Sequence, residues 1–461
     1  MSSKLQSQDM TTGRLLPQII LFSLPLAASG ILQLLFNAAD LIVVGKFAGS
    51  TPLAAVGATG SLINLLVNAF VGISVGVNVL VARDLGCRHE EKVRRTIHCA
   101  FALSALLGLI VLVLGLSLSA PLLRAMDTPE DILPLSALYM RIYFLGVPAS
   151  LVYNFGAAIL RAFGDTRRPF VFLAISGVIN ALLNLFFVIV FHMDVAGVAL
   201  ATVISQYISL LLIIRCLVKA EGCGHLELRS IRLNGRDVLS ILQIGLPAGL
   251  TGVIFNISNV IIQSTVNSFG ASIVAANTAA NNIEGFCYTA VNSVSLAAIT
   301  FTSQNLGAGR YERIKKTFPC CVATVFLIGL PFCLSAFFFG PQLLSIYVSK
   351  TDASYAVIIE CGMKRIVRLS AVEFLCGWMD SCCGMVRGLG KSWKPMLVTI
   401  FGACVFRLVW IATIFRLSPT LETLYVSYPI SWILTAAVHS ICFVFDYRKL
   451  IRRVAEAAAI L

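Results

Sequence analysis

Acidic and amide side chains inside long apolar stretches are the residues of this chain that could do chemistry. Gln33, Asn37 and Asp40 lie in the first stretch, and spacings of four and three residues place them on one face of a helix. A carboxyl group inside a membrane is costly to keep charged, so it usually faces a cavity or a partner and marks function. Asp40 could bind and release a proton, or hold Na⁺ with amide oxygens, because hard cations prefer oxygen ligands. The alternative is a simply hydrated Asp near the outer membrane face.

Amide side chains recur in the fourth and fifth apolar stretches. Asn180 and Asn184 lie one helical turn apart in the fifth stretch, so they share a face. They could join Asp40 in a Na⁺ site, or they could only form hydrogen bonds between helices, as Asn commonly does in membranes. Asn154 in the fourth stretch is a further candidate for lining a cavity.

The second half of the chain carries acidic and amide candidates of its own. Glu284 and Asp380 are candidate proton or cation sites, and Asn281 shares a helical face with Glu284. Asn259 and Gln263 follow each other at helical spacing in the seventh stretch and are candidates for lining a cavity.

Arginines near these acidic residues have a structural interpretation. Arg365 and Arg368 precede Glu373 closely enough in the sequence to be its partners. Arg407 lies inside the eleventh stretch and could neutralise a carboxylate.

The composition indicates that these residues sit in a membrane protein. Of the 461 residues, 58% are hydrophobic and only 12% are charged, whereas a soluble domain carries about 25% charged residues. The net charge of +13 could suggest a nucleic-acid partner, but the basic residues lie in short loops between apolar stretches. That distribution is the positive-inside pattern of membrane proteins. We therefore expect the lipid bilayer, and no nucleic acid, as a partner.

Twelve apolar stretches are long enough to cross a bilayer as helices, which takes about 20 residues each. They lie near residues 15–45, 52–82, 97–119, 134–160, 168–192, 194–217, 238–268, 273–304, 317–345, 363–386, 394–415 and 424–445. The N-terminus and the even-numbered gaps hold most of the basic residues. This bias predicts that both termini lie in the cytoplasm, on the inner side of the cell membrane.

An internal repeat divides the chain into two halves. LFSLPLAASG (Leu21–Gly30) resembles QIGLPAGLTG (Gln243–Gly252), and RAFGDTRRP (Arg161–Pro169) resembles RGLGKSWKP (Arg387–Pro395). The polar loop between the halves predicts an N-terminal lobe at 1–218, an inter-lobe loop at 219–237 and a C-terminal lobe at 238–461. Each half holds six spans, so we expect an all-α polytopic protein with two lobes related by a pseudo-two-fold axis and a substrate site between them.

Three segments resemble the multidrug and toxic compound extrusion (MATE) family, most closely its bacterial DinF-like branch. They are FNAADLIVVGKFAGSTPLAAVGA (Phe36–Ala58), SQNLGAGRYERIKK (Ser303–Lys316) and RAFGDTRRP. The resemblance implies twelve helices in two six-helix lobes and export of cationic or amphiphilic organic compounds in exchange for H⁺ or Na⁺. It also implies that Asp40 is the main coupling residue and that Asn180 lines the cavity of its lobe. Asn184 departs from the pattern, because many relatives have Asp at that position.

The leading hypothesis is therefore a secondary active multidrug exporter that works by alternating access. A lipid-linked precursor flippase of the same wider superfamily is the alternative, but those proteins tend to have a strongly cationic cavity, whereas the acidic and amide residues here favour cationic cargo. Dispersed His and Cys residues give no catalytic or metal-binding constellation, and there is no P-loop, so we expect neither an enzyme nor an ATP-driven pump. We expect a monomer without a cofactor other than the coupling ion.

Overall fold

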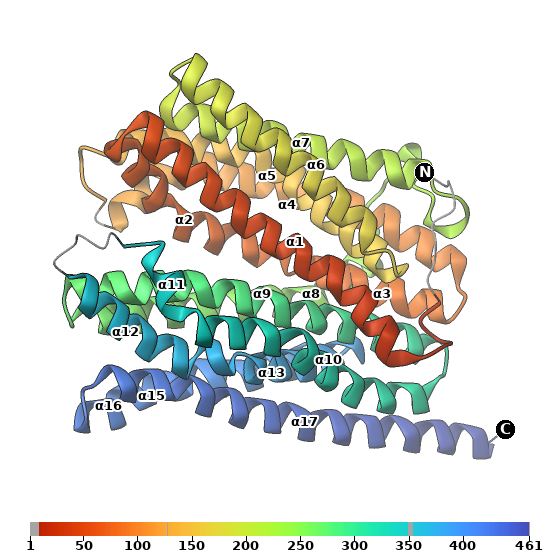
Figure 1. Ribbon diagram of the computed structural model, residues 1–461. Helices are drawn as coiled ribbons and strands as arrows, with labels where there is room; N and C mark the ends of the chain where they lie inside the picture. The colour runs from red at the N-terminus through yellow and green to blue at the C-terminus, as the bar shows by residue number, and fades with distance from the viewer. Residues whose placement is uncertain (1–8, 127, 349–353, 461) are drawn as a thin grey trace. The chain divides into compact units, whose positions relative to one another are not determined.

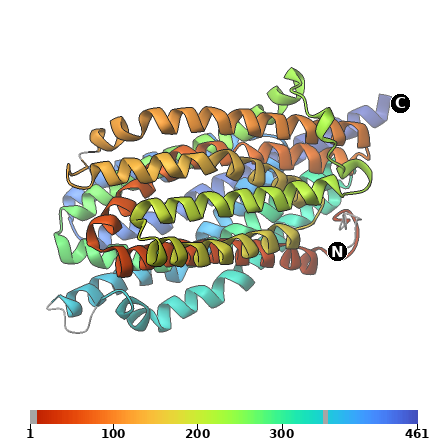
Figure 2. The ribbon, with the colours of Figure 1, turned by 90° about the horizontal axis from the view of Figure 1, so that it is seen from above.

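The computed structural model describes residues 9–126, 128–348 and 354–460, and these residues form helices joined by turns, with no β-strand among them (Figures 1 and 2). The predicted all-α polytopic fold is confirmed. Apolar stretches of this length fold as helices because a helix satisfies its own backbone N–H and C=O groups where no water is available.

The helices follow the predicted stretches in order. The first half contains α1 (Leu15–Val43), α2 (Ser50–Val71), α3 (Ser74–Gly86), α4 (Glu90–Ala125), α5 (Leu133–Ala162), α6 (Arg167–Leu185) and α7 (Asp194–Val218). The second half contains α8 (Gly235–Asn267), α9 (Ala271–Gly307), α10 (Tyr311–Phe338), α11 (Gly340–Ser345), α12 (Tyr355–Arg368), α13 (Phe374–Gly388), α14 (Trp393–Thr399), α15 (Phe406–Ala412), α16 (Ile414–Leu417) and α17 (Leu421–Ile460).

Each of the twelve predicted stretches is helical, but they differ in how well they suit a membrane. Ten helices among the described residues are long and apolar enough to cross one. An eleventh candidate is the pair Tyr355–Val372 and Phe374–Gly388, which is bent by 41° at a short break. The remaining stretch, α9, has 37 residues, and several amides and Glu284 make it more polar than the others.

The chain forms two compact units whose boundaries differ from the predicted division at 219–237. The first unit contains Ala28–Gly252, and the second contains Met10–Ala27 and Val253–Leu461. The difference arises because α1 and α8 are long helices whose first and second halves belong to different units. The beginning of α1 packs in the second unit, where Phe22 lies edge-on against Phe301 with ring centroids 5.7 Å apart.

The beginning of α8 packs in the first unit through glycines. A Cβ atom added at Gly72 would lie 2.4 Å from the Cα of Gly249, and one added at Gly249 would lie 2.1 Å from the carbonyl oxygen of Ala69. The backbones therefore touch at this crossing, which only glycine permits.

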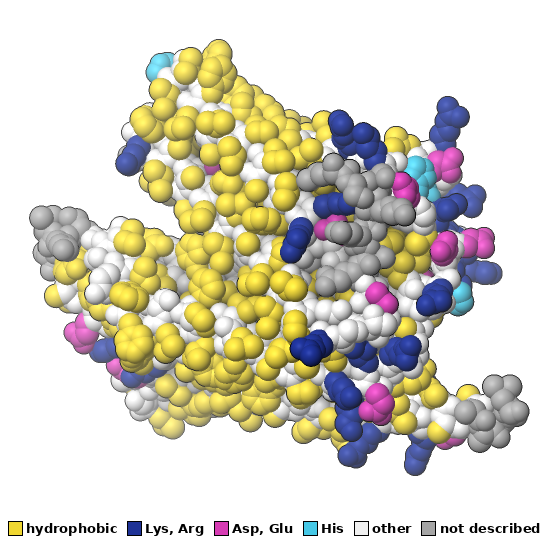
Figure 3. Space-filling model, turned by 45° about the vertical axis from the view of Figure 1, so that its right-hand side comes forward, with side chains coloured by type: hydrophobic (Ala, Val, Ile, Leu, Met, Phe, Trp, Pro, Cys, Tyr) yellow, Lys and Arg dark blue, Asp and Glu magenta, His cyan; other side chains and the backbone are white. Residues whose placement is uncertain are grey.

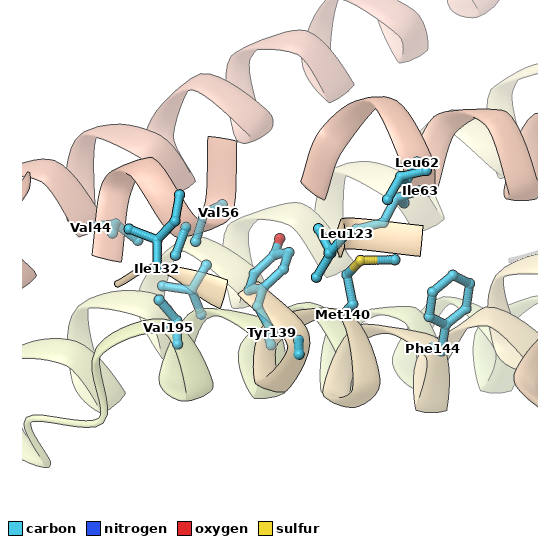
Figure 4. Packing of buried hydrophobic residues seen from close by; sticks show 14 of the residues in the cluster. Val44, Val56, Leu62, Ile63, Leu123, Ile132, Tyr139, Met140, Phe144 and Val195 are labelled. Atoms are coloured by element: carbon cyan, nitrogen blue, oxygen red, sulfur yellow. The ribbon is translucent and has the colours of Figure 1, made fainter. Parts of the chain in front are cut away.

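Apolar side chains fill the interior of each unit and also cover its outside. In the first unit, Tyr139 and Met140 of α5 are buried among side chains that include Leu62, Ile63 and Leu123 (Figure 4). On the face drawn in Figure 3, hydrophobic side chains cover the middle of the helices, and most of the visible Lys and Arg side chains gather toward one end. An apolar exterior whose Lys and Arg side chains lie away from its middle suits helices that lie in lipid.

Candidate functional site

The structure brings Asp40 of α1 together with Asn180 and Asn184 of α6 in the first unit. Asn184 is fully buried and donates a hydrogen bond from Nδ2 to Asp40 Oδ1. With its amide oriented so that both atoms have partners, Asn180 donates to the same Oδ1 at 2.9 Å and accepts from the Thr202 backbone N–H at 3.3 Å. The one-turn spacing of the two asparagines aims both side chains at one carboxylate oxygen. We call Asp40, Asn180 and Asn184 the Asp40 site.

Irregular helix turns follow both elements of the Asp40 site. α1 continues into a π-helical turn at Val44–Ala48, and α6 continues into one at Phe186–Val190. The two turns contact each other. Gly49, with φ of 100°, then reverses the chain into α2; this is a conformation that glycine adopts without strain. π-turns are often found at functional sites, and here they fix the ends of the two helices that carry the polar residues.

The Asp40 site can stabilise either form of its carboxyl group. Amide donors stabilise a carboxylate, whereas a half-buried place among apolar helices favours the neutral acid. Each form thus has a stabilising feature, as a group that takes up and releases a proton requires. The Oδ1 atom of Asn184 is buried without a hydrogen-bond partner among the described residues, while Nδ2 of the same amide faces Asp40.

The other candidates of the first half lie apart from these hydrogen bonds. Gln33 and Asn37 are exposed on α1. Asn154 is half-buried and donates to the Ser150 carbonyl oxygen of its own helix at 2.8 Å. None of the three bonds to Asp40 in the described part of the chain.

The second unit places Glu284 in an ion pair with an arginine. Arg365 of α12 is buried, and its Nη2 lies 2.8 Å from Glu284 Oε2. The same guanidinium donates to Asn277 Oδ1 at 2.7 Å and to Asn281 Oδ1 at 3.0 Å. Tyr425 of α17 also donates to Asn277 Oδ1, at 3.1 Å. We call these five residues the Arg365 cluster.

Both amide candidates of the seventh stretch lie on α8, and one of them contacts the Arg365 cluster. Gln263 accepts from Asn277 Nδ2 at 2.8 Å, so it extends the Arg365 cluster to α8. Asn259 is half-buried on the same helix, one turn earlier.

Among the described residues, neither Arg365 nor Arg368 forms a salt bridge or hydrogen bond with Glu373, which corrects that prediction. Arg365 binds Glu284 instead, and Arg368 donates to the Lys364 carbonyl oxygen at 3.1 Å. Arg365 nevertheless lies near enough to Glu373 to interact with it electrostatically. Glu373 is 1% exposed, and its Oε2 has no hydrogen-bond partner among the described residues.

Asp380 of α13 is half-buried and forms a hydrogen bond with Tyr288 of α9. The guanidinium of Arg387 also acts on this carboxylate, so Asp380 differs from Asp40 in having a cationic neighbour besides its neutral partner.

Arg407 neutralises no carboxylate in the described part of the chain, contrary to expectation. It is 1% exposed, donates from Nε to Ser431 Oγ at 2.9 Å and lies 4.0 Å from the ring centroid of Tyr428. Aromatic faces attract a cation through the ring quadrupole, and this contact replaces the expected ion pair.

The family of the chain follows from comparison with known proteins. A family model described as MatE matches residues 25–186 and 247–413. The chain belongs to the MatE family. The two matched segments correspond to the two halves of the internal repeat and include the Asp40 site and most of the Arg365 cluster. The resemblance drawn from the sequence is thereby confirmed.

Individual relatives cover most of this MatE protein. It is 26% identical over 389 residues to the probable multidrug resistance protein YoeA of Bacillus subtilis, covering 83% of each chain. It is 27% identical over 348 residues to the FAD transporter of Shewanella oneidensis, covering 72% of this chain and 76% of that protein. A crystal structure of MATE in complex with MaL6 has a TM-score of 0.89 at 24% identity, covering 98% of this chain and 100% of that one.

These findings make the chain a multi-pass membrane transporter of a multidrug efflux family, and not an enzyme. A transport role is consistent with the carboxyl groups inside these helices, because ionisable residues are rare in membrane spans and usually mark function.

Proposed function

We propose that this MatE-family protein is a secondary active exporter that exchanges small organic cations or amphiphiles from the cytoplasm for H⁺ or Na⁺. Asp40 is the main coupling residue, and the site is exposed alternately to the two sides of the membrane. Both termini lie in the cytoplasm, the protein works as a monomer in the inner membrane, and no cofactor is needed besides the coupling ion.

The observation that carries the proposal is the carboxylate of Asp40, which faces two amides and no cationic side chain among the described residues. An acidic group inside the membrane must neutralise its charge by binding a proton or a cation. Exchange requires that ion and substrate favour opposite states of such a group, so that binding one promotes release of the other.

The proposed cargo follows from the same charge. A carboxylate attracts cations, and the relatives named as multidrug resistance proteins support a broad range of small molecules. Asp380, beside Tyr288, is a second proposed coupling residue. Glu284 already has its charge balanced by Arg365, and its role is argued below.

A resistance assay in cells tests the proposal. We expect Asp40→Asn to abolish resistance to cationic dyes and drugs, because an amide can neither release a proton nor balance a cation. Membrane insertion should be intact, because the substitution adds no charge to the membrane-spanning helix. Asp131→Asn, at an exposed position between α4 and α5, is the matched control and should retain resistance. If the Asp40→Asn cells were as resistant as the control cells at equal protein abundance, Asp40 would not be the coupling residue.

A further inference from the structure

The Arg365 cluster has the composition of a cation site. Asn277, Asn281 and Glu284 lie at i, i+4 and i+7 of α9, so their oxygens form a row on one helical face. All three oxygens contact the guanidinium of Arg365, at 2.7 to 3.0 Å. One carboxylate and two amide carbonyls are ligands that hard cations prefer. The Asp40 site also combines one carboxylate with two amides, but there the amide nitrogens face the carboxylate.

Aromatic rings complete the enclosure around the guanidinium. The central carbon of the Arg365 guanidinium lies 5.5 Å from the ring centroid of Tyr425 and 5.8 Å from that of Tyr428. Tyr425 also directs its hydroxyl to Asn277 Oδ1. Oxygen ligands combined with aromatic faces recognise a compact monovalent cation. In this unit the cation is the guanidinium of Arg365, which is part of the protein.

The internal repeat indicates that the ion pair is not required to hold these helices together. Carrying the offset between Arg161 and Arg387 back along the chain pairs Arg365 with Tyr139. Tyr139 lies in the apolar cluster of the first unit (Figure 4), where the corresponding helix packs through hydrophobic contacts. Hydrophobic residues often replace a buried ion pair without loss of stability. Stabilisation of the fold alone therefore does not explain why the second unit has the Arg365–Glu284 ion pair.

We propose that Arg365 is a tethered cation that occupies a cation-binding site formed by Asn277, Asn281, Glu284 and Tyr425. While Arg365 is in place, the site binds no free ion, and its ligand once Arg365 is removed is a small monovalent cation such as Na⁺ or guanidinium. The inference deepens the proposed antiport, on which its functional meaning rests: ion exchange takes place at the Asp40 site, and Glu284 contributes no exchangeable ion.

A binding measurement on the purified protein tests this inference without any need for transport. We expect millimolar guanidinium or Na⁺, at constant ionic strength set with N-methylglucamine, to raise the melting temperature of Arg365→Ala in a saturable manner. Ligand that binds only the folded state stabilises it in this way. Any shift caused by Na⁺ at the Asp40 site is common to all of these proteins. Beyond it, the wild type and Arg368→Ala, whose side chain donates to the Lys364 carbonyl oxygen of its own helix, should show no saturable shift. Arg365→Ala combined with Glu284→Gln should lose the shift.

Absence of a cation-specific shift in Arg365→Ala relative to Arg368→Ala would overturn the inference. If Arg365→Ala does not fold, Arg365→Met keeps the volume of the stem and should gain Na⁺ binding. If neither variant folds, added guanidinium or Na⁺ should restore folding, and failure to do so would also overturn it. An active Asp40→Asn variant would refute the coupling role of Asp40 and leave this binding result unaffected, so the two failures are distinguishable.

Discussion

Asn184 gives the clearest test at the scale of single residues. Its Nδ2 donates to Asp40, and a hydrogen bond to a charged group contributes about 1.5–3 kcal/mol. We expect Asn184→Ala to lower the rate of dye efflux by roughly tenfold or more, because the charged form of Asp40 loses a donor. The measurement is dye efflux from energised cells, normalised to the amount of protein in the membrane.

The matched control for that change is Asn154→Ala. Asn154 is also an amide within an apolar helix and is half-buried, but it donates to a carbonyl oxygen of its own helix. An equal loss of efflux in both variants would mean that Asn184 acts through helix packing rather than through Asp40.

The contacts of individual residues could be predicted only where they depend on spacing along one helix. The one-turn separation of Asn180 and Asn184 indicated a shared face, and both side chains do meet Asp40. The partner of Glu284 was not predictable in this way, because Arg365 lies 81 residues away in the sequence. Glu373, only a few residues from Arg365, was the expected partner, but Arg365 directs its hydrogen bonds to Glu284 and to two amides of α9 instead.

At the scale of elements, the glycine crossing of α2 and α8 fixes how closely two helices approach. We expect Gly249→Ala to lower the free energy of unfolding by about 1–3 kcal/mol, because the new Cβ would lie 2.1 Å from the Ala69 carbonyl oxygen and the helices must separate. Thermal unfolding of the purified protein in detergent measures the effect.

Gly252→Ala on the same helix is the control for this substitution. A Cβ at Gly252 would meet no atom within 4 Å, so its melting temperature should remain close to that of the wild type. Equal melting temperatures for the two variants would contradict the packing argument.

The existence and order of the helices followed from hydropathy alone, whereas their grouping did not. Apolar length identifies a span, and the repeat identified equivalent helices such as α1 and α8. The sequence does not show that the first half of each of these helices belongs to the other unit. That grouping depends on contacts such as Phe22 with Phe301 and Gly72 with Gly249, which join segments far apart in the chain.

At the scale of the whole molecule, the basic loops predict the orientation in the membrane. The C-terminal segment carries Arg448, Lys449, Arg452 and Arg453, and such clusters stay on the cytoplasmic side. We expect green fluorescent protein fused to the C-terminus to fluoresce and alkaline phosphatase fused there to be inactive. The reverse pair of results would place the C-terminus outside the cytoplasm and contradict the proposed orientation of the protein in the membrane.

The central claim for the whole molecule is that ion exchange at Asp40 drives export. It is tested most directly by dye transport in proteoliposomes with an imposed pH gradient or, separately, an imposed Na⁺ gradient. We predict that one of the two gradients drives transport by the wild type and that neither drives transport by Asp40→Asn. Equal gradient-driven transport by both proteins, or wild-type transport that ignores both gradients, would contradict the account.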